Sequence, residues 1–280
     1  MIENQIKTVI LLGALSGLLL WVGDLLGGMQ GLSIAIVFVL GMNLASYFFS
    51  DKIVLKMYRA QEVPKSHKLY SMVTELARSA KLPTPKVYII PSGNPNAFAT
   101  GRNPKHSAVA CTEGILDLLT DAELKGVLAH ELSHIKNRDT LIQTIAASIA
   151  GIISYVAMMA RWAALFGGFG GRDDRGGNGI ELLVLAIVTP LVATIIQLAI
   201  SRSREYMADE SGAKISHNPH GLASALEKIH HESSRNPMRF GNPSTSSLFI
   251  TNPFKANTLV RLLSTHPPME ERVKRLRAMH

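Results

Sequence analysis

The sequence contains a single cysteine, Cys111, among its 280 residues. An intramolecular disulfide is therefore impossible, and a structural zinc site made of several thiolates is excluded. Cys111 ends the small apolar segment 108–111, which is typical of a buried structural thiol. Aromatic residues are also scarce, at 6%, whereas 47% of all residues are hydrophobic. The apolar content is thus mostly aliphatic, which favours membrane spans over an enlarged soluble core.

Charged residues are almost absent from two long stretches near the N-terminus. Residues 8–26 form an apolar run broken only by Asp24, and residues 32–49 form a second run of similar character. A signal peptide is the alternative for the first run, since Lys7 precedes it, but no clear cleavage pattern follows and the second run comes almost at once. We predict that residues 1–50 form a retained transmembrane hairpin.

A second pair of apolar runs occupies residues 141–166 and 180–200, with a glycine-rich loop between them. The loop follows no predicted strand, which argues against a phosphate-binding function. Pro190 lies inside the later run, and an internal proline suits a transmembrane helix better than a soluble one. A hairpin buried against protein is the alternative. We predict that residues 141–200 cross the bilayer, which gives four transmembrane helices in all.

The net charge of +8 is compatible with nucleic acid binding, but the basic residues are distributed as in a membrane protein. Lys and Arg are absent from the loop 27–31 and plentiful after residue 51. This asymmetry predicts that segments 51–140 and 201–280 lie in the cytoplasm, as two parts of one domain, and it argues against a nucleic acid partner.

Local patterns in the polar segments predict a small mixed domain. Residues 66–80 have the spacing of an amphipathic helix, and residues 86–90 and 107–112 have the composition of strands. Thr120 is a suitable cap for a helix that begins near residue 121. The C-terminal residues 269–279 predict a basic amphipathic helix, for which the simplest interpretation is a solvated packing helix. The fold class is therefore mainly α-helical, with a small α+β domain.

One motif in this domain carries chemistry. His130, Glu131 and His134 follow the order H-E-x-x-H within a run that predicts a helix. Because residues four apart share a helix face, the two histidines can bind one metal ion, and Glu131 can take a proton from water activated there. The five-residue pattern also arises by chance on surface helices, so the hypothesis needs a third ligand.

The third ligand has to come from a distant segment. An H-E-x-x-H-x-x-G-x-x-H site is excluded because Asn137 and Thr140 occupy the positions of its glycine and third histidine. Glu205 is the first credible candidate, and Asp209, four residues later, could hold the ring N–H of a ligand histidine. A surface helix with internal Arg–Glu pairs is the alternative. The predicted hairpin 141–200 returns the chain to the same side of the membrane, so Glu205 can meet the motif helix.

These features together resemble the HtpX-type membrane zinc metalloproteases, which are related to the CAAX prenyl proteases. The matching segments are the two N-terminal spans and residues 130–134, 137–139, 201–202, 205–209 and 265–268. The resemblance implies one Zn²⁺ per chain bound by His130, His134 and Glu205, with Glu131 as the catalytic carboxylate. It also implies a gluzincin-like fold for the protease domain.

The resemblance implies further roles as well. His266 becomes the candidate for stabilising the oxyanion, although a turn histidine is the alternative. An edge strand near Asn96, Phe98 and Ala99 would bind the substrate backbone. Asp139 is expected to support its helix or the ligand shell rather than to act chemically.

The implied activity is that of an endopeptidase that hydrolyses misfolded membrane proteins. The expected partners are the lipid bilayer and polypeptide substrates, and the expected location is the cell (inner or plasma) membrane, with a multi-pass chain and a cytoplasmic active site. A protease of prenylated or other lipid-modified peptides ranks second, because four spans are too few for an enclosed chamber. A transporter and an inactive scaffold are weaker alternatives: the polar residues cluster beside the membrane, and a scaffold would not require Glu131.

Overall fold

The computed structural model describes residues 52–166, 179–235, 249–250 and 267–279, together with scattered positions between 6 and 48. The chain divides into two compact units. One unit contains residues 1–5, 47–142 and 201–280, and the other contains residues 6–46 and 143–200. The sheet and the residues of the predicted metal site belong to the first unit. The assignment of the predicted domains 1–50, 51–140, 141–200 and 201–280 to bilayer and cytoplasm stays a prediction.

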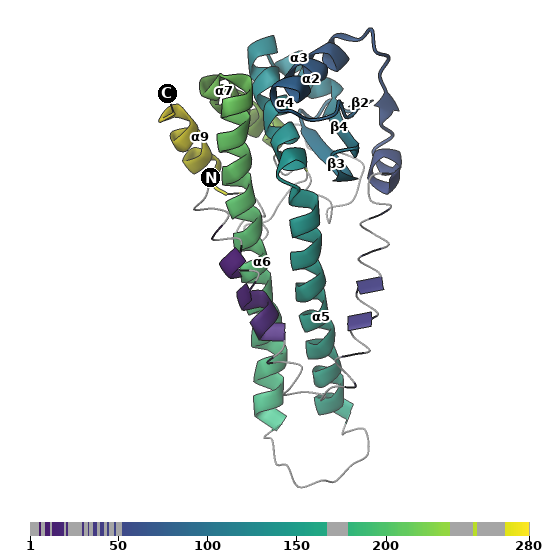
Figure 1. Cartoon of the computed structure of the whole chain (residues 1–280). Helices are drawn as coiled ribbons and strands as arrows, with labels where there is room; N and C mark the ends of the chain where they lie inside the picture. Colours follow the sequence, from purple (N-terminus) through teal and green to yellow (C-terminus); the bar gives the residue numbers. More distant parts are fainter. Residues whose placement is uncertain are drawn as a thin grey trace. The chain divides into compact units, whose positions relative to one another are not determined.

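The first unit contains a four-stranded sheet in the order β1-β2-β4-β3. Its strands are β1 (Gln61–Glu62), β2 (Lys86–Ile90), β3 (Ala97–Asn103) and β4 (His106–Thr112). β2 and β4 are parallel, whereas β1 and β3 run antiparallel to their neighbours. The strands predicted from residues 86–90 and 107–112 are confirmed. β3 lies at the edge of the sheet and contacts the motif helix α4 (Asp121–Lys136) (Figure 1).

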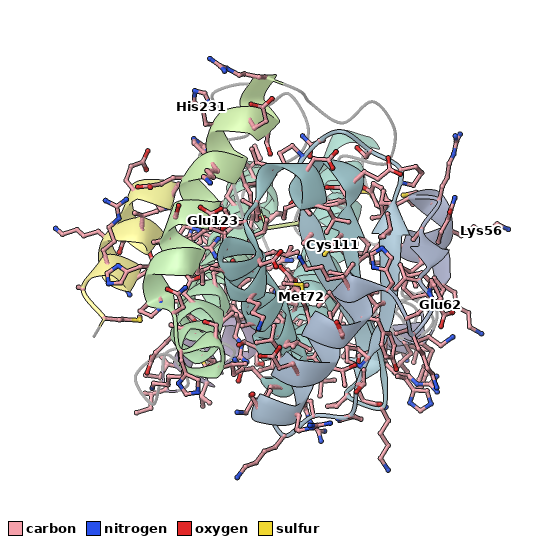
Figure 2. The ribbon with its side chains drawn as sticks, turned by 90° about the horizontal axis from the view of Figure 1, so that it is seen from above. Lys56, Glu62, Met72, Cys111, Glu123 and His231 are labelled. Carbon is pink, nitrogen blue, oxygen red and sulfur yellow. The ribbon has the colours of Figure 1, made fainter. Side chains whose placement is uncertain are left out.

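Side chains alternate between the two faces of this sheet, as strand geometry requires. Val109 and Cys111 of β4 belong to the core shared with the helices, whereas Ala110 faces a smaller cluster with Phe98. Burial raises the pKa of the Cys111 thiol. The predicted structural role of this residue agrees with its full burial, and Figure 2 places it among the packed elements, with Met72 nearby.

Seven helices are named among the described residues. They are α2 (Lys68–Ser79), α3 (Glu113–Leu118), α4 (Asp121–Lys136), α5 (Asp139–Phe166), α6 (Gly179–Ser216), α7 (Pro219–Arg235) and α9 (Met269–Arg277). The helix predicted near residues 66–80 is confirmed as α2, and its apolar stripe is buried. A mainly helical fold with a small sheet is therefore confirmed.

The four predicted transmembrane helices are not confirmed. In the part of the chain that the structure describes, no helix has both the length and the apolar character needed to span a membrane. The predicted runs 8–26 and 32–49 lie partly outside the described residues.

The turn between α4 and α5 is tight and unusual. Arg138 adopts a positive φ of 56°, a left-handed conformation that is uncommon for residues other than glycine. The amides of Leu141 and Ile142 donate to its carbonyl, at 3.1 and 3.3 Å, so that α5 starts immediately. As a consequence, Asp139 stands in the first turn of α5, close in sequence to the end of the motif helix.

The start of α4 is held by a buried carboxylate. Thr120 and Glu123 form a reciprocal capping box. Glu123 also accepts hydrogen bonds from Ser224, at 2.6 Å, and Lys228, at 2.9 Å, both on α7. Burial alone would raise the pKa of Glu123, but the hydrogen bonds from Ser224, Lys228 and Thr120 lower it to about 2.

This arrangement predicts a pH-dependent contribution to stability. Because the pKa of Glu123 is lowered from 4.5 to about 2 on folding, its stabilising effect is present above pH 4.5 and is lost as the pH falls toward 2. The difference amounts to about 3 kcal/mol at neutral pH. We expect Glu123→Gln to lower the free energy of unfolding by an amount of this order at pH 7 and by much less near pH 2. Glu75→Gln, which removes only an exposed pair with Lys125, is the control. If the free energy of unfolding differed between parent and Glu123→Gln by the same amount at both pH values, the ionised carboxylate would not be the source of the stability.

Candidate metal centre

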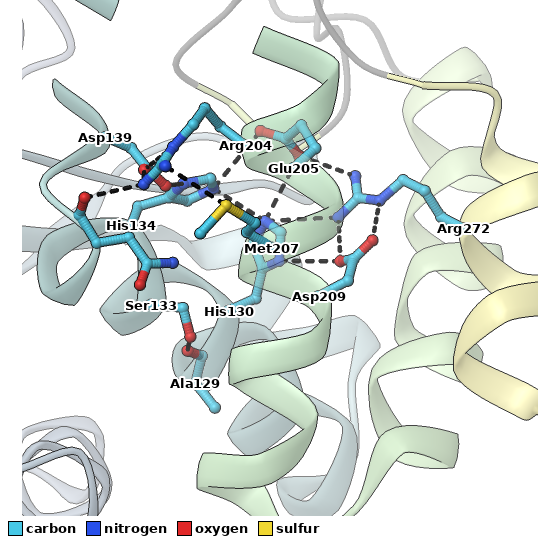
Figure 3. Close-up of polar contacts among 11 residues, drawn as sticks. Ala129, His130, Ser133, His134, Asp139, Arg204, Glu205, Met207, Asp209 and Arg272 are labelled. Atoms are coloured by element: carbon cyan, nitrogen blue, oxygen red, sulfur yellow. Dashed lines mark hydrogen bonds and ion pairs between the residues drawn. The ribbon is translucent and has the colours of Figure 1, made fainter. Parts of the chain in front are cut away.

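Two ligand histidines of the motif lie one turn apart on α4, and Glu205 of α6 faces both of them (Figure 3). The two Nε2 atoms of His130 and His134 are 3.1 Å apart. Glu205 places Oε2 3.6 Å from His130 Nε2 and Oε1 3.5 Å from His134 Nε2. A tetrahedral zinc ion with bonds of about 2.05 Å holds its ligand atoms about 3.3 Å apart. The three side chains therefore fit a single zinc ion.

A glycine allows α6 to approach the motif helix this closely. A Cβ atom on Gly212 would lie 2.9 Å from both the backbone nitrogen and the Cα of His130. Only glycine permits this distance between the two backbones without a shift of one helix. The close packing also buries the site, and only His134 keeps appreciable exposure, at 16% of its side chain, against 1% for His130. Water can therefore reach the site from the His134 side.

The outer nitrogen of His134 is fixed by a carboxylate. His134 Nδ1 lies 2.6 Å from Asp139 Oδ2, at the start of α5. Arg204 of α6 donates to the other oxygen of Asp139 and also to the carbonyl of Asn137, at 2.8 Å. The contact between His134 and Asp139 favours the tautomer with its proton on Nδ1, which would leave Nε2 of His134 to bind a metal ion.

His130 is held in the same manner from the opposite side. Its Nδ1 lies 3.0 Å from Asp209 Oδ1, one turn after Glu205 on α6. Arg272 of α9 in turn binds Asp209 through two contacts, at 2.7 and 2.8 Å. Burial alone would raise the pKa of Asp209, but Arg272 and His130 lower it to about 2. Each histidine is thus backed by an aspartate, and each aspartate by an arginine.

The net negative charge of the buried side chains favours binding of a divalent cation. Four buried carboxylates meet here, and two buried guanidinium groups accompany them; the carboxylates are those of Glu131, Asp139, Glu205 and Asp209. With neutral histidines, two negative charges are left without balance among these groups, and uncompensated buried charge is costly. Burial alone would lower the pKa of His134, but Asp139 and Glu205 raise it to about 9, so a proton competes with the metal for this ligand.

Glu131 lies next to the first ligand and is buried. Its carboxylate accepts a hydrogen bond from the backbone N–H of Ala99 on β3. Burial raises the pKa of Glu131, His130 and His134 oppose that rise, and Glu205 adds to it. The carboxylate is therefore held between the metal cluster and the edge strand of the sheet.

The structure places most of the predicted site residues around this cluster. Asn96 is buried and bonded to Thr112 at the start of β3, and Phe98 faces the aromatic cluster on the far side of the sheet. Of the edge-strand residues, Ala99 is the one bonded to Glu131. His266 lies outside the described residues, so its predicted role stays a prediction.

Sequence reasoning missed the two arginines. The helix predicted from residues 269–279 is confirmed as α9, but its interpretation as a solvated packing helix is wrong for Arg272, which is fully buried. Burial of Arg272 could have been predicted from the sequence, because this residue shares the helix face of Val273 and Leu276. The alternative of a surface helix with internal Arg–Glu pairs is wrong for Arg204, which is buried and binds Asp139.

Proteins that hold zinc between two histidines of one helix, with a glutamate beside the first, are typically metallopeptidases. Fold and site assign this chain to that class. Residues 64–280 match the family model described as Peptidase family M48. The chain belongs to peptidase family M48, and the predicted zinc metallopeptidase is confirmed at this level.

Relatives from bacteria and archaea are similar over nearly the whole chain. A "Protease HtpX homolog" of Desulforapulum autotrophicum is 56% identical, over 98% of this chain and 89% of that protein. Proteins of the same description from Thermodesulfovibrio yellowstonii and Pyrococcus furiosus are 55% and 53% identical, over 99% and 97% of this chain and 98% and 94% of theirs. These relatives confirm the resemblance.

One solved structure shows the same fold. The crystal structure of S. mikatae Ste24p superposes with a TM-score of 0.62 at 19% sequence identity, over 98% of this chain and 66% of that chain. At this identity the likeness concerns the fold alone.

We expect Asp139→Asn to weaken zinc binding by about 10- to 100-fold, because a neutral amide holds the His134 N–H less firmly and leaves Arg204 without its counter-charge. Competition with a chelator of known affinity measures the dissociation constant. Asp121→Asn, which removes an exposed pair with Lys68, is the control and should bind zinc as the parent does. An unchanged constant in Asp139→Asn would remove this residue from the ligand support.

Gly212→Ala should be harmful although it adds only a methyl group. The new atom would meet backbone atoms of His130, so α4 and α6 have to separate, at a cost of about 1–3 kcal/mol. The separation also moves Asp209 away from His130. We expect a lower thermal midpoint and less zinc per chain. Gly17→Ala, where a Cβ would meet nothing within 4 Å, is the control. Equal zinc content and midpoint in Gly212→Ala would refute the packing argument.

Proposed function

We propose that this protein is an integral membrane zinc endopeptidase that hydrolyses misfolded or damaged membrane proteins at the cytoplasmic face. The observation that carries the proposal is the spacing of the three candidate ligand atoms, with Glu131 adjoining the first ligand. The membership in family M48 and the similarity to proteases described as HtpX homologues support it.

In the proposed reaction, Glu131 acts as general base and then as general acid. Zinc, when bound, supplies a Lewis acid that activates both water and the scissile carbonyl. Glu131 takes a proton from the attacking water and later delivers it to the leaving amine. Burial raises the pKa of Glu131, which favours uptake of a proton by this carboxylate. His266 remains the candidate for stabilising the oxyanion.

The edge strand β3 is proposed to bind the substrate in an extended form. Backbone groups of alternate residues point away from the sheet, and on β3 these belong to Ala97 and Ala99. Two contacts support this assignment: the Ile250 N–H donates to the Ala97 carbonyl, at 3.2 Å, and the Ala99 N–H donates to Glu131. A substrate strand added at this edge would lie beside the motif helix.

The membrane topology completes the proposal. Residues 1–50 and 141–200 are proposed to form two transmembrane hairpins, and the basic segments that flank them favour a cytoplasmic active site. This arrangement would bring membrane proteins within reach of the site, and it can be tested by cysteine accessibility in Cys111→Ser variants that carry a new cysteine in the loop 27–31 or near residue 65.

We expect Glu131→Gln to lower the rate of peptide hydrolysis by about 10²- to 10⁴-fold, because the amide cannot accept the proton of the attacking water. Zinc content should remain that of the parent, since Glu131 is not among the candidate ligands. Casein cleavage and metal analysis of the purified full chain measure both quantities. Equal cleavage by parent and variant would disprove the role of Glu131 as general base.

The class of substrate requires a separate comparison. A destabilised membrane protein and a prenylated peptide, each matched with its folded or unlipidated counterpart, should be offered to the same preparation. Preferential cleavage of the destabilised membrane protein supports quality control. Preferential cleavage of the prenylated peptide would instead favour the alternative, a protease of lipid-modified peptides.

A further inference from the structure

Arg272 is an exception on the inner face of α9. Its neighbours on that face, Val273 and Leu276, are apolar and buried, and Arg272 itself has 0% exposure. A fully buried guanidinium is costly unless its partners compensate for the lost hydration. The partners of Arg272 are therefore the reason for its position.

These partners are the groups that surround the candidate metal (Figure 3). Nε and Nη2 bind the two oxygens of Asp209, at 2.8 and 2.7 Å. Nη1 lies 3.3 Å from Glu205 Oε2. Nη2 also lies 3.4 Å from Nε2 of His130. One side chain of the C-terminal helix thus contacts two candidate ligands and the carboxylate that supports one of them.

The planar guanidinium orients the carboxylates of Asp209 and Glu205 and also balances part of their negative charge. Two parallel hydrogen bonds hold Asp209 so that one oxygen faces His130 Nδ1, and the remaining nitrogen restrains Glu205. We propose that Arg272 is a positioning residue of the metal centre, through which α9 sets the orientation of Glu205 and His130 and hence the affinity for zinc. The inference rests on the proposed ligand set.

A purely structural role is the competing explanation. α9 also packs on α7, and Arg277 binds both oxygens of Glu227 there, at 2.8 and 2.9 Å. Arg277 therefore anchors the same helix without contact with the metal cluster. If Arg272 served only to anchor α9, its replacement would lower the thermal midpoint and leave zinc affinity unchanged in the folded protein.

The test compares Arg272→Met, Arg272→Lys and Arg277→Met in the full chain. The dissociation constant for zinc, measured by chelator competition, should rise about 10- to 100-fold in Arg272→Met, as for other groups that orient metal ligands. Arg272→Lys should lie between the parent and Arg272→Met, because an ammonium restores the charge but not the two parallel bonds. Arg277→Met should bind zinc like the parent. The visible absorption of bound Co²⁺ should change in Arg272→Met and not in Arg277→Met.

A second variant covers the case in which Arg272→Met does not fold. The double change Arg272→Met with Asp209→Asn removes both members of the buried pair, so that no uncompensated charge is left between them. We expect this double variant to fold and to bind zinc more weakly than the parent. A folded double or single variant with the parental constant would overturn the proposal.

One further variant separates this inference from the ligand assignment. His130→Ala should abolish stoichiometric zinc binding. Loss in His130→Ala with parental affinity in Arg272→Met would disprove the role of Arg272 and keep the ligands. Parental affinity in His130→Ala would disprove the ligand set itself.

Discussion

Burial of four carboxylates at one contact between helices is the constraint on which this protease unit depends. Glu131, Asp139, Glu205 and Asp209 are all nearly inaccessible to water. Carboxylates in such surroundings are either neutralised or compensated. Here two arginines compensate for two of the charges, and with neutral histidines a bound divalent cation would balance the other two. A metal ion would thus contribute to the electrostatic balance of the fold as well as to the chemistry.

The rest of the unit holds the parts of this charge cluster together. The capping box of α4 and its bonds to α7 fix the start of the motif helix, and Gly212 lets α6 lie directly against His130. The turn at Arg138 returns Asp139 to His134. The sheet contributes its edge strand, whose Ala99 N–H contacts Glu131.

Much of the fold was accessible from local patterns. The strands 86–90 and 107–112, the helix of residues 66–80 and the cap at Thr120 follow from alternation, periodicity and capping chemistry, which act over a few residues. The two-residue strand β1 was missed because so short a segment shows no period. The membrane spans depend on hydropathy alone, and the described residues do not confirm them.

For the site, the motif alone was enough to predict the chemistry. H-E-x-x-H places two ligands on one helix face, because four residues make about one turn, and it places a base beside the first ligand. The sequence also indicated Glu205 and Asp209, because these two residues are again four positions apart and share a helix face. The charges that compensate the site became apparent only from the packing of the helices. Arg204 meets Asp139 across 65 positions, and Arg272 meets Asp209 across 63. No local pattern encodes such pairs, because they form only when helices distant in sequence pack and bury them.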